Sequence, residues 1–151
     1  RATRRAQRND PAARGARMTF PVEIIADGAT PLAYIVNPDW RPDATQFLTP
    51  DDFTQQMGMI VYKAGESIIP HVHIPVERTI TGTTECIVVR EGRCEIDIYN
   101  SRREPIASRM LEKGAIILLL GGGHGFRMIE DTVLFEVKQG PYAGGRDKER
   151  F

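Results

Sequence analysis

The chain has few of the residues that carry metal or redox chemistry, and it has no long apolar run. Among 151 residues there are three histidines and two cysteines, and Cys86 and Cys94 have neither the spacing of metal ligands nor that of a redox pair. The longest apolar run, Ala115 to Leu120, is far too short to cross a bilayer, and no stretch has the layout of a secretory signal. We therefore expect a cytoplasmic protein with reduced cysteines and no membrane partner.

The chain also lacks net charge, but this balance hides two unlike parts. Residues 1–17 contain six arginines against a single acid, Asp10, which leaves the other 134 residues with 14 basic and 19 acidic side chains. We expect this basic segment, residues 1–17, to be disordered; a nucleic-acid-binding arm and an organelle transit peptide are the alternatives. The acidic remainder argues against nucleic acid as a partner of the folded body.

The body, residues 18–140, is predicted to form one all-β domain. Short apolar or alternating segments, most of them closed by Gly, Pro, Asn or Asp, predict about ten strands, which is typical of a sandwich or barrel. The predicted strands are Pro21–Ala26, Leu32–Val36, Met57–Lys63, Ile68–His73, Glu85–Arg90, Arg93–Tyr99, Pro105–Leu111, Ala115–Leu120, Gly125–Ile129 and Thr132–Lys138. One short helical turn is expected at Thr49–Phe53, where a capping Thr precedes a Pro and two acids. Residues 141–151 are expected to form a coil tail.

Glu85 is predicted to be a carboxylate aimed into an apolar interior. If Glu91-Gly92 is the two-residue turn of a hairpin, Glu85 faces Ile98 across the strands and shares its side of the hairpin with apolar residues. The same register places the two cysteines on opposite faces, where they cannot form a disulfide. A buried carboxylate is costly unless a cation or hydrogen bonds meet it, and a bound metal ion would be such a cation.

The three histidines lie at positions in the sequence from which they could bind one metal ion. His71 and His73 are separated by a single residue, so an extended strand places both imidazoles on the same face. His124 is the third histidine, and Glu85 stands where it could complete the set.

The spacing of these residues resembles the cupin superfamily of small β-barrels. The first cupin motif is matched by Gly65, His71, His73, Glu85 and Gly92, and the second by Gly114 and His124. The resemblance covers residues 56–138, and the segment Val137–Tyr142 is similar to the end of a group of small single-domain bacterial cupins of unestablished activity.

The resemblance implies a fold and a ligand set. The fold is a double-stranded β-helix, or jelly roll, and its four ligands would be His71, His73, Glu85 and His124. They would bind one divalent transition metal, such as Fe, Mn, Ni, Co or Zn. Eleven residues separate His73 from Glu85, which is more than cupins usually have. Only three residues separate His73 from Glu77, so Glu77 is a rival ligand.

Two classes of function follow from this reading. We expect a metal-dependent enzyme of the isomerase or oxygenase type, acting on a small polar substrate such as a sugar derivative or a keto- or hydroxy-acid. The alternative is a non-catalytic metal-bearing barrel that binds a small-molecule ligand. Glu77 and Arg78 are the candidate catalytic residues, for acid/base work and for holding an anionic group, unless they belong to an exposed salt-bridging loop.

Three further residues are candidates for binding the substrate. Phe126 and Met128 share their strand parity with His124, although core packing is the simpler role for both. Lys138 could reach the site from the last strand. We also expect a homodimer that pairs through a sheet edge, for which Met18–Val36 is the candidate segment.

Overall fold

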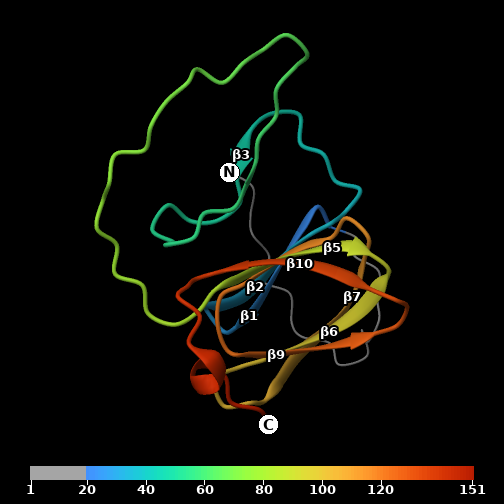
Figure 1. Cartoon of the computed structure of the whole chain (residues 1–151). Helices are drawn as coiled ribbons and strands as arrows, with labels where there is room; N and C mark the ends of the chain where they lie inside the picture. The colour runs from blue at the N-terminus through green and yellow to red at the C-terminus, as the bar shows by residue number, and fades with distance from the viewer. Residues whose placement is uncertain (1–19) are drawn as a thin grey trace.

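The computed structural model describes residues 20–151, and they form two facing antiparallel sheets (Figure 1). The larger sheet has the strand order β1 (Val22–Asp27), β2 (Thr30–Val36), β8 (Ile116–Leu119), β5 (Glu85–Glu91) and β10 (Val133–Lys138). The smaller sheet has the order β7 (Pro105–Glu112), β6 (Arg93–Tyr99) and β9 (Gly123–Met128), and a short ribbon joins β3 (Gln46–Phe47) to β4 (Gly58–Met59). The all-β prediction is confirmed, whereas the basic segment 1–17 lies outside the described residues.

The core lies between the two sheets and follows the period-two pattern of the strands. Alternate residues of β5 and of β6, such as Ile87 and Ile96, are almost fully buried, because successive side chains of a strand point to opposite faces. The same cluster draws Ile35 from β2, Ile117 from β8 and Leu111 from β7. Burial of this apolar surface is the main term that holds the sheets together.

The two sheets are tied along one side and separate along the other. Arg109 on β7 donates to both carboxylate oxygens of Glu23 on β1, with an Nη2 to Oε1 distance of 2.6 Å. This bidentate ion pair joins one edge strand of each sheet. At the opposite side, β9 and β10 are also edge strands, and among residues 20–151 each has a strand partner along one edge only.

The predicted β5–β6 hairpin is wrong, although the faces it assigned are right. Both edges of β5 are taken by β8 and β10, and both edges of β6 by β7 and β9, so the chain crosses from one sheet to the other at Gly92. Gly92 has φ +76°, and a Cβ there would lie 2.1 Å from the Asp131 carbonyl oxygen. The interior faces of β5 and β6 meet across the core, and Cys86 and Cys94 are free thiols whose pKa values are raised by burial.

Four local predictions need correction. Thr49–Phe53 forms a turn closed by a single Phe53 N to Pro50 O hydrogen bond of 3.2 Å and not a helical turn, because no further hydrogen bond continues it. The predicted strand Met57–Lys63 is reduced to β4, and Ile68–His73 forms no strand. The tail contains a short 3-10 helix, η2 (Gly144–Asp147). Within residues 20–151, no helix has the length and apolar character needed to cross a membrane.

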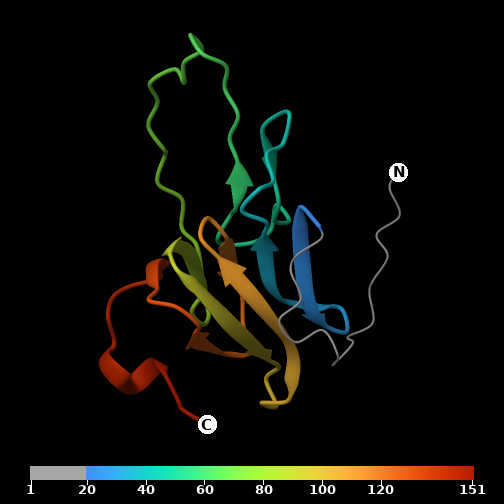
Figure 2. The ribbon, with the colours of Figure 1, turned by 90° about the vertical axis from the view of Figure 1, so that its right-hand side faces the viewer.

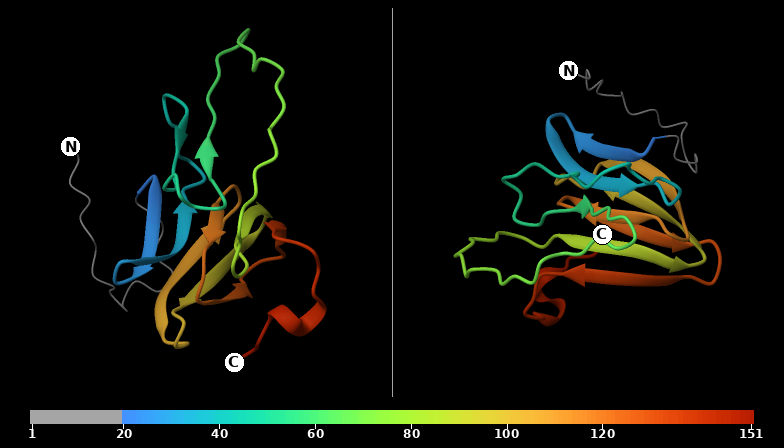
Figure 3. Two further views of the ribbon diagram at one scale, coloured as in Figure 1. Left: turned by 90° about the vertical axis from the view of Figure 1, so that its left-hand side faces the viewer. Right: turned by 90° about the horizontal axis from the view of Figure 1, so that it is seen from above.

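Residues 62–83 form a long excursion that we call the arm. Every residue of the arm is exposed and none is in a strand. Figure 2 shows the arm projecting away from the two sheets, and both views of Figure 3 agree. The arm therefore leaves the sandwich after β4 and returns to it immediately before β5.

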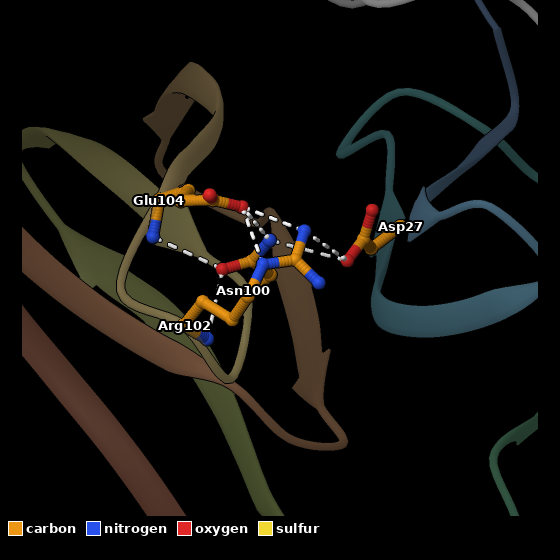
Figure 4. A network of polar contacts seen from close by, with 4 residues as sticks. All are labelled: Asp27, Asn100, Arg102 and Glu104. Carbon is orange, nitrogen blue, oxygen red and sulfur yellow. Dashed lines mark hydrogen bonds and ion pairs between the residues drawn. The ribbon is translucent and has the colours of Figure 1, made fainter.

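A polar network fixes the β6–β7 turn against the β1–β2 turn (Figure 4). The buried Asn100 accepts hydrogen bonds from the backbone N–H groups of Arg102 and Glu104, both at 3.0 Å. Its amide nitrogen donates to Glu104 Oε2 at 2.7 Å and to Asp27 Oδ2 at 3.2 Å. One side chain thus satisfies the turn's backbone donors and links the two sheets at the end where the turns meet.

Candidate functional site

The centre of the site is a carboxylate and an imidazole that meet between the sheets. Glu85 is the first residue of β5 and His124 lies on β9, and the His124 Nε2 atom is 3.1 Å from Glu85 Oε2. Glu85 shares its strand face with the buried Ile87 and Val89, and only 5% of it is exposed. The prediction of a carboxylate aimed inward is thereby confirmed, with His124 as its neighbour from the opposite sheet.

Strand register explains why His124 faces the interior. His124 lies opposite Ile98 on β6, and Phe126 lies opposite Ile96, so both share the face of buried isoleucines. The Phe126 ring is 6.0 Å from the His124 ring, centroid to centroid, and packs against the core. Met128 follows on the same face but is half exposed, which places it further from the centre of the site.

Two ammonium groups face the second oxygen of Glu85. Lys138 lies opposite Glu85 in the β10–β5 register, and its Nζ is 3.9 Å from Glu85 Oε1 and 3.0 Å from Glu136 Oε1. The hydrogen bond to Glu136 is the main cause that raises the pKa of Lys138, and the charge of Glu85 adds to it. Lys148, in the tail after η2, has its Nζ 3.9 Å from Glu85 Oε1.

A half-open cavity of about 1600 Å³ extends from this centre. Glu85, His124 and Lys138 line it together with the turn between β8 and β9 and with the C-terminal tail. The tail is held there by Phe151, whose ring meets Tyr99 edge-on with 5.2 Å between centroids. A Cβ on Gly123 would lie 2.8 Å from the Phe151 ring, so a glycine at the start of β9 makes room for the tail.

A group of side chains fixes the point where the arm returns to β5. Thr84 N donates to Gln139 Oε1 at 2.6 Å, Gln139 Nε2 donates to the Thr84 hydroxyl at 2.8 Å, and the Thr84 hydroxyl bonds the Gln55 side chain. Gln139 follows β10 directly, so these contacts tie the start of β5 to the end of its neighbour. The position of Glu85 at the start of β5 is therefore well defined.

The remaining predicted site residues lie on the arm. His71 and His73 are exposed, with 5.2 Å between ring centroids, and the Nδ1 atom of His71 is 2.9 Å from the Ile69 carbonyl oxygen. Glu77 and Arg78 are exposed as well and, with His73, line a small concavity within the arm. In the part of the chain that the structure describes, no three His, Cys, Asp or Glu side chains gather as a metal site would need.

The structure therefore joins part of the predicted set. Glu85, His124 and Lys138 come together at the cavity, whereas the two arm histidines, Glu77 and Arg78 stand apart from it. Sequence reasoning missed Lys148, because a charged tail without periodicity gives no sign of where its side chains point. No family model, curated protein or solved structure matches the chain.

Proposed function

We propose that this chain is a metal-binding jelly-roll protein of the cupin type. One divalent transition metal would be held by His71, His73, Glu85 and His124. The observation that carries the proposal is the Glu85–His124 pair, a buried carboxylate 3.1 Å from an imidazole at the head of a cavity. Burial makes a carboxylate costly unless a cation or hydrogen bonds meet it, and a divalent metal ion bound to Glu85 would be such a cation.

The topology leaves room for the two histidines of the arm. His124 lies on the edge strand β9, and Glu85 lies on β5 next to the edge strand β10. Each of these edge strands retains a free hydrogen-bonding edge within residues 20–151. The arm contains the apolar segment Ile68–His73, which has strand pattern but no strand partner. A strand formed there by this segment would bring an alternating histidine pair to the cavity and would close the open side of the sandwich.

The donor set fits the proposed metal. Three neutral imidazoles and one carboxylate suit Fe, Mn, Ni, Co or Zn, and a metal so bound would supply Lewis acidity, or redox chemistry if it is iron. The chain's own residues would orient the substrate: Lys138 and Lys148 carry positive charge at the cavity, and Phe126, whose ring centroid is 6.0 Å from that of His124, would be the nearby apolar contact. This arrangement favours a small polar substrate with an anionic group, such as a keto- or hydroxy-acid or a sugar derivative.

The reaction class we propose is isomerisation or oxygenation in the cytoplasm. The alternative is a non-catalytic metal-bearing barrel that binds a small ligand. One observation favours this alternative: Glu77 and Arg78, the candidates for acid/base work, are exposed on the arm and do not line the cavity. A reaction would need a titratable group beside the metal, whereas simple binding would not.

Metal titration of the purified protein tests the shared premise. We expect the chelator-treated protein to take up one equivalent of Mn²⁺, Co²⁺, Ni²⁺ or Zn²⁺ by calorimetry. Glu85→Gln and His124→Ala should each weaken uptake by a hundredfold or more, because each removes a ligand. Glu77→Gln is the matched control, since it makes the same change at the rival position on the arm. Unchanged uptake by Glu85→Gln, or loss with Glu77→Gln alone, would overturn the ligand assignment.

A further inference from the structure

The arm carries two different faces. Alternate residues of an extended chain share a face, so His71 and His73 belong to one side together with Ile69. Between residues 68 and 76, the other side carries only aliphatic side chains and a proline. Its exposed aliphatic members are Ile68, Val72, Ile74 and Val76. Val72 and Ile74 are 86% and 80% exposed, far more than a soluble surface tolerates in a row.

The arm is extended and projects from its own body (Figure 2), which it rejoins at residues 81–83 on the rim of the cavity. Its departure is fixed by the Val61 N to Thr45 Oγ1 hydrogen bond of 2.8 Å, and its return by the bonds around Thr84. The side-chain hydrogen bonds within the arm are local, such as Arg78 Nη1 to the Val76 carbonyl oxygen at 3.3 Å. Pro70 and Pro75 restrict the residues before them to extended backbone, so the arm does not collapse on itself.

Docking on its own body would leave half of the arm uncovered. A strand added beside β9 would turn the histidine face toward the cavity, and the aliphatic face would then point to water on an edge strand. The five exposed Ile and Val side chains on the aliphatic face, counting Ile80, represent roughly 60–120 Å² of apolar area each. Their total of roughly 300–600 Å² is a large part of the ~800 Å² that each partner buries in a standard interface.

The body offers an apolar surface next to the open side. Val133, Phe135 and Val137 alternate along β10 on the face turned away from the core, and they are 52%, 54% and 48% exposed. β10 is an edge strand that ends at Lys138, opposite Glu85 on β5. An apolar row on an edge strand, close to an incomplete ligand pair, is the surface that an aliphatic strand would cover.

We propose that the arm of one protomer docks on the open side of a second copy of this chain. His71 and His73 of one protomer would complete the Glu85–His124 pair of the other. Each copy would give its arm and receive its partner's, as two-fold symmetry requires, and the aliphatic face would be covered between the two copies. This inference rests on the proposed metal site, and it adds that the site is shared between protomers.

Complementation between two inactive chains tests the exchange. One chain carries His71→Ala and His73→Ala, and the other carries Glu85→Gln and His124→Ala, with different affinity tags. Neither chain alone should bind Co²⁺ at the site. The doubly tagged heterodimer should bind one Co²⁺ per two chains, half the stoichiometry of the native protein, because one arm and one cavity remain intact together. If the native protein binds Co²⁺ but the heterodimer binds none, the arm closes within its own chain and the exchange is overturned, while the proposed metal site stands.

The oligomeric state supplies a readout that needs no metal. By light scattering coupled to size exclusion, we expect the native chain to be a dimer and the Val72→Asp/Ile74→Asp variant to be a folded monomer. Ser67→Asp, which adds charge at a polar position of the arm, should remain a dimer. If the native protein takes up no metal, the proposed function fails, and the docking is then decided here alone: a dimeric Val72→Asp/Ile74→Asp variant, or a monomeric native chain, would overturn it.

Discussion

The turn network around Asn100 makes a quantitative prediction about stability. Asn100→Ala removes the acceptor of two backbone N–H groups, both bonded at 3.0 Å, and the amide that links Asp27 to Glu104. A buried donor left without a partner costs about 1–3 kcal/mol. Because residues 101–104 of the turn are exposed, water can replace part of the lost bonding, and we expect a loss of roughly 2–4 kcal/mol in the free energy of unfolding.

Urea unfolding followed by circular dichroism measures this loss, at one fixed protein concentration so that association does not shift the midpoint. The m-value should stay constant. Ser101→Ala is the matched control in the same turn, since Ser101 is exposed, and it should change stability by less than about 0.5 kcal/mol. A loss below about 1 kcal/mol for Asn100→Ala would mean that water replaces its carbonyl oxygen without penalty, and the network would then not hold the turn.

Three other changes have expected outcomes of known sign. Gly92→Ala should lower the urea midpoint by an amount equivalent to ~2 kcal/mol or more, because its φ is +76° and its Cβ would meet the Asp131 carbonyl; a neutral result would refute the crossing geometry. Ile117→Ala should cost about 2–5 kcal/mol, because Ile117 is fully buried, and a thermal melt checks it. The pKa of Glu104 is lowered from its usual value of 4.5, first by its hydrogen bond to the Arg102 side chain. The ionised Glu104 side chain therefore stabilises the folded state above pH 4.5, and this contribution is lost as the pH falls through the lowered pKa. Glu104→Gln should flatten this acid limb of a melting-temperature profile, and an unchanged limb would contradict the assignment.

Strands that meet another strand were predictable from the sequence. β2, β8 and β5 are alternating or apolar runs closed by turn residues, and the structure pairs them in one sheet. The interior faces of β5 and β6 were assigned correctly from a hairpin that does not exist. The reason is that alternation fixes which residues share a face, whether the neighbouring strand lies beside it or across the core.

Strands that lack a partner were not predictable in the same way. Ile68–His73 has the composition of a strand, but a strand is stable only where its backbone groups pair. Residues 20–151 offer the arm no such partner in its present position. The candidate site was predictable to the same extent: Glu85 and His124 meet because paired strands carry them, whereas the two arm histidines depend on a segment whose partner no local pattern specifies.

The arm and the cavity are incomplete in complementary ways. Glu85 is buried, and one of its oxygens faces two ammonium groups at 3.9 Å, beyond hydrogen-bonding distance. The arm exposes aliphatic side chains whose transfer from water would stabilise any structure that covers them, by roughly 1.5–3 kcal/mol for each fully buried Ile or Val. Moving the histidine face of an arm to the cavity would address both costs in one step. The imidazoles would complete a site for a metal cation beside the carboxylate, and the aliphatic face of the same strand would reach an interface. A second copy supplies that interface and a single chain does not. Metal binding and dimerisation are therefore expected to depend on the same docking of the arm.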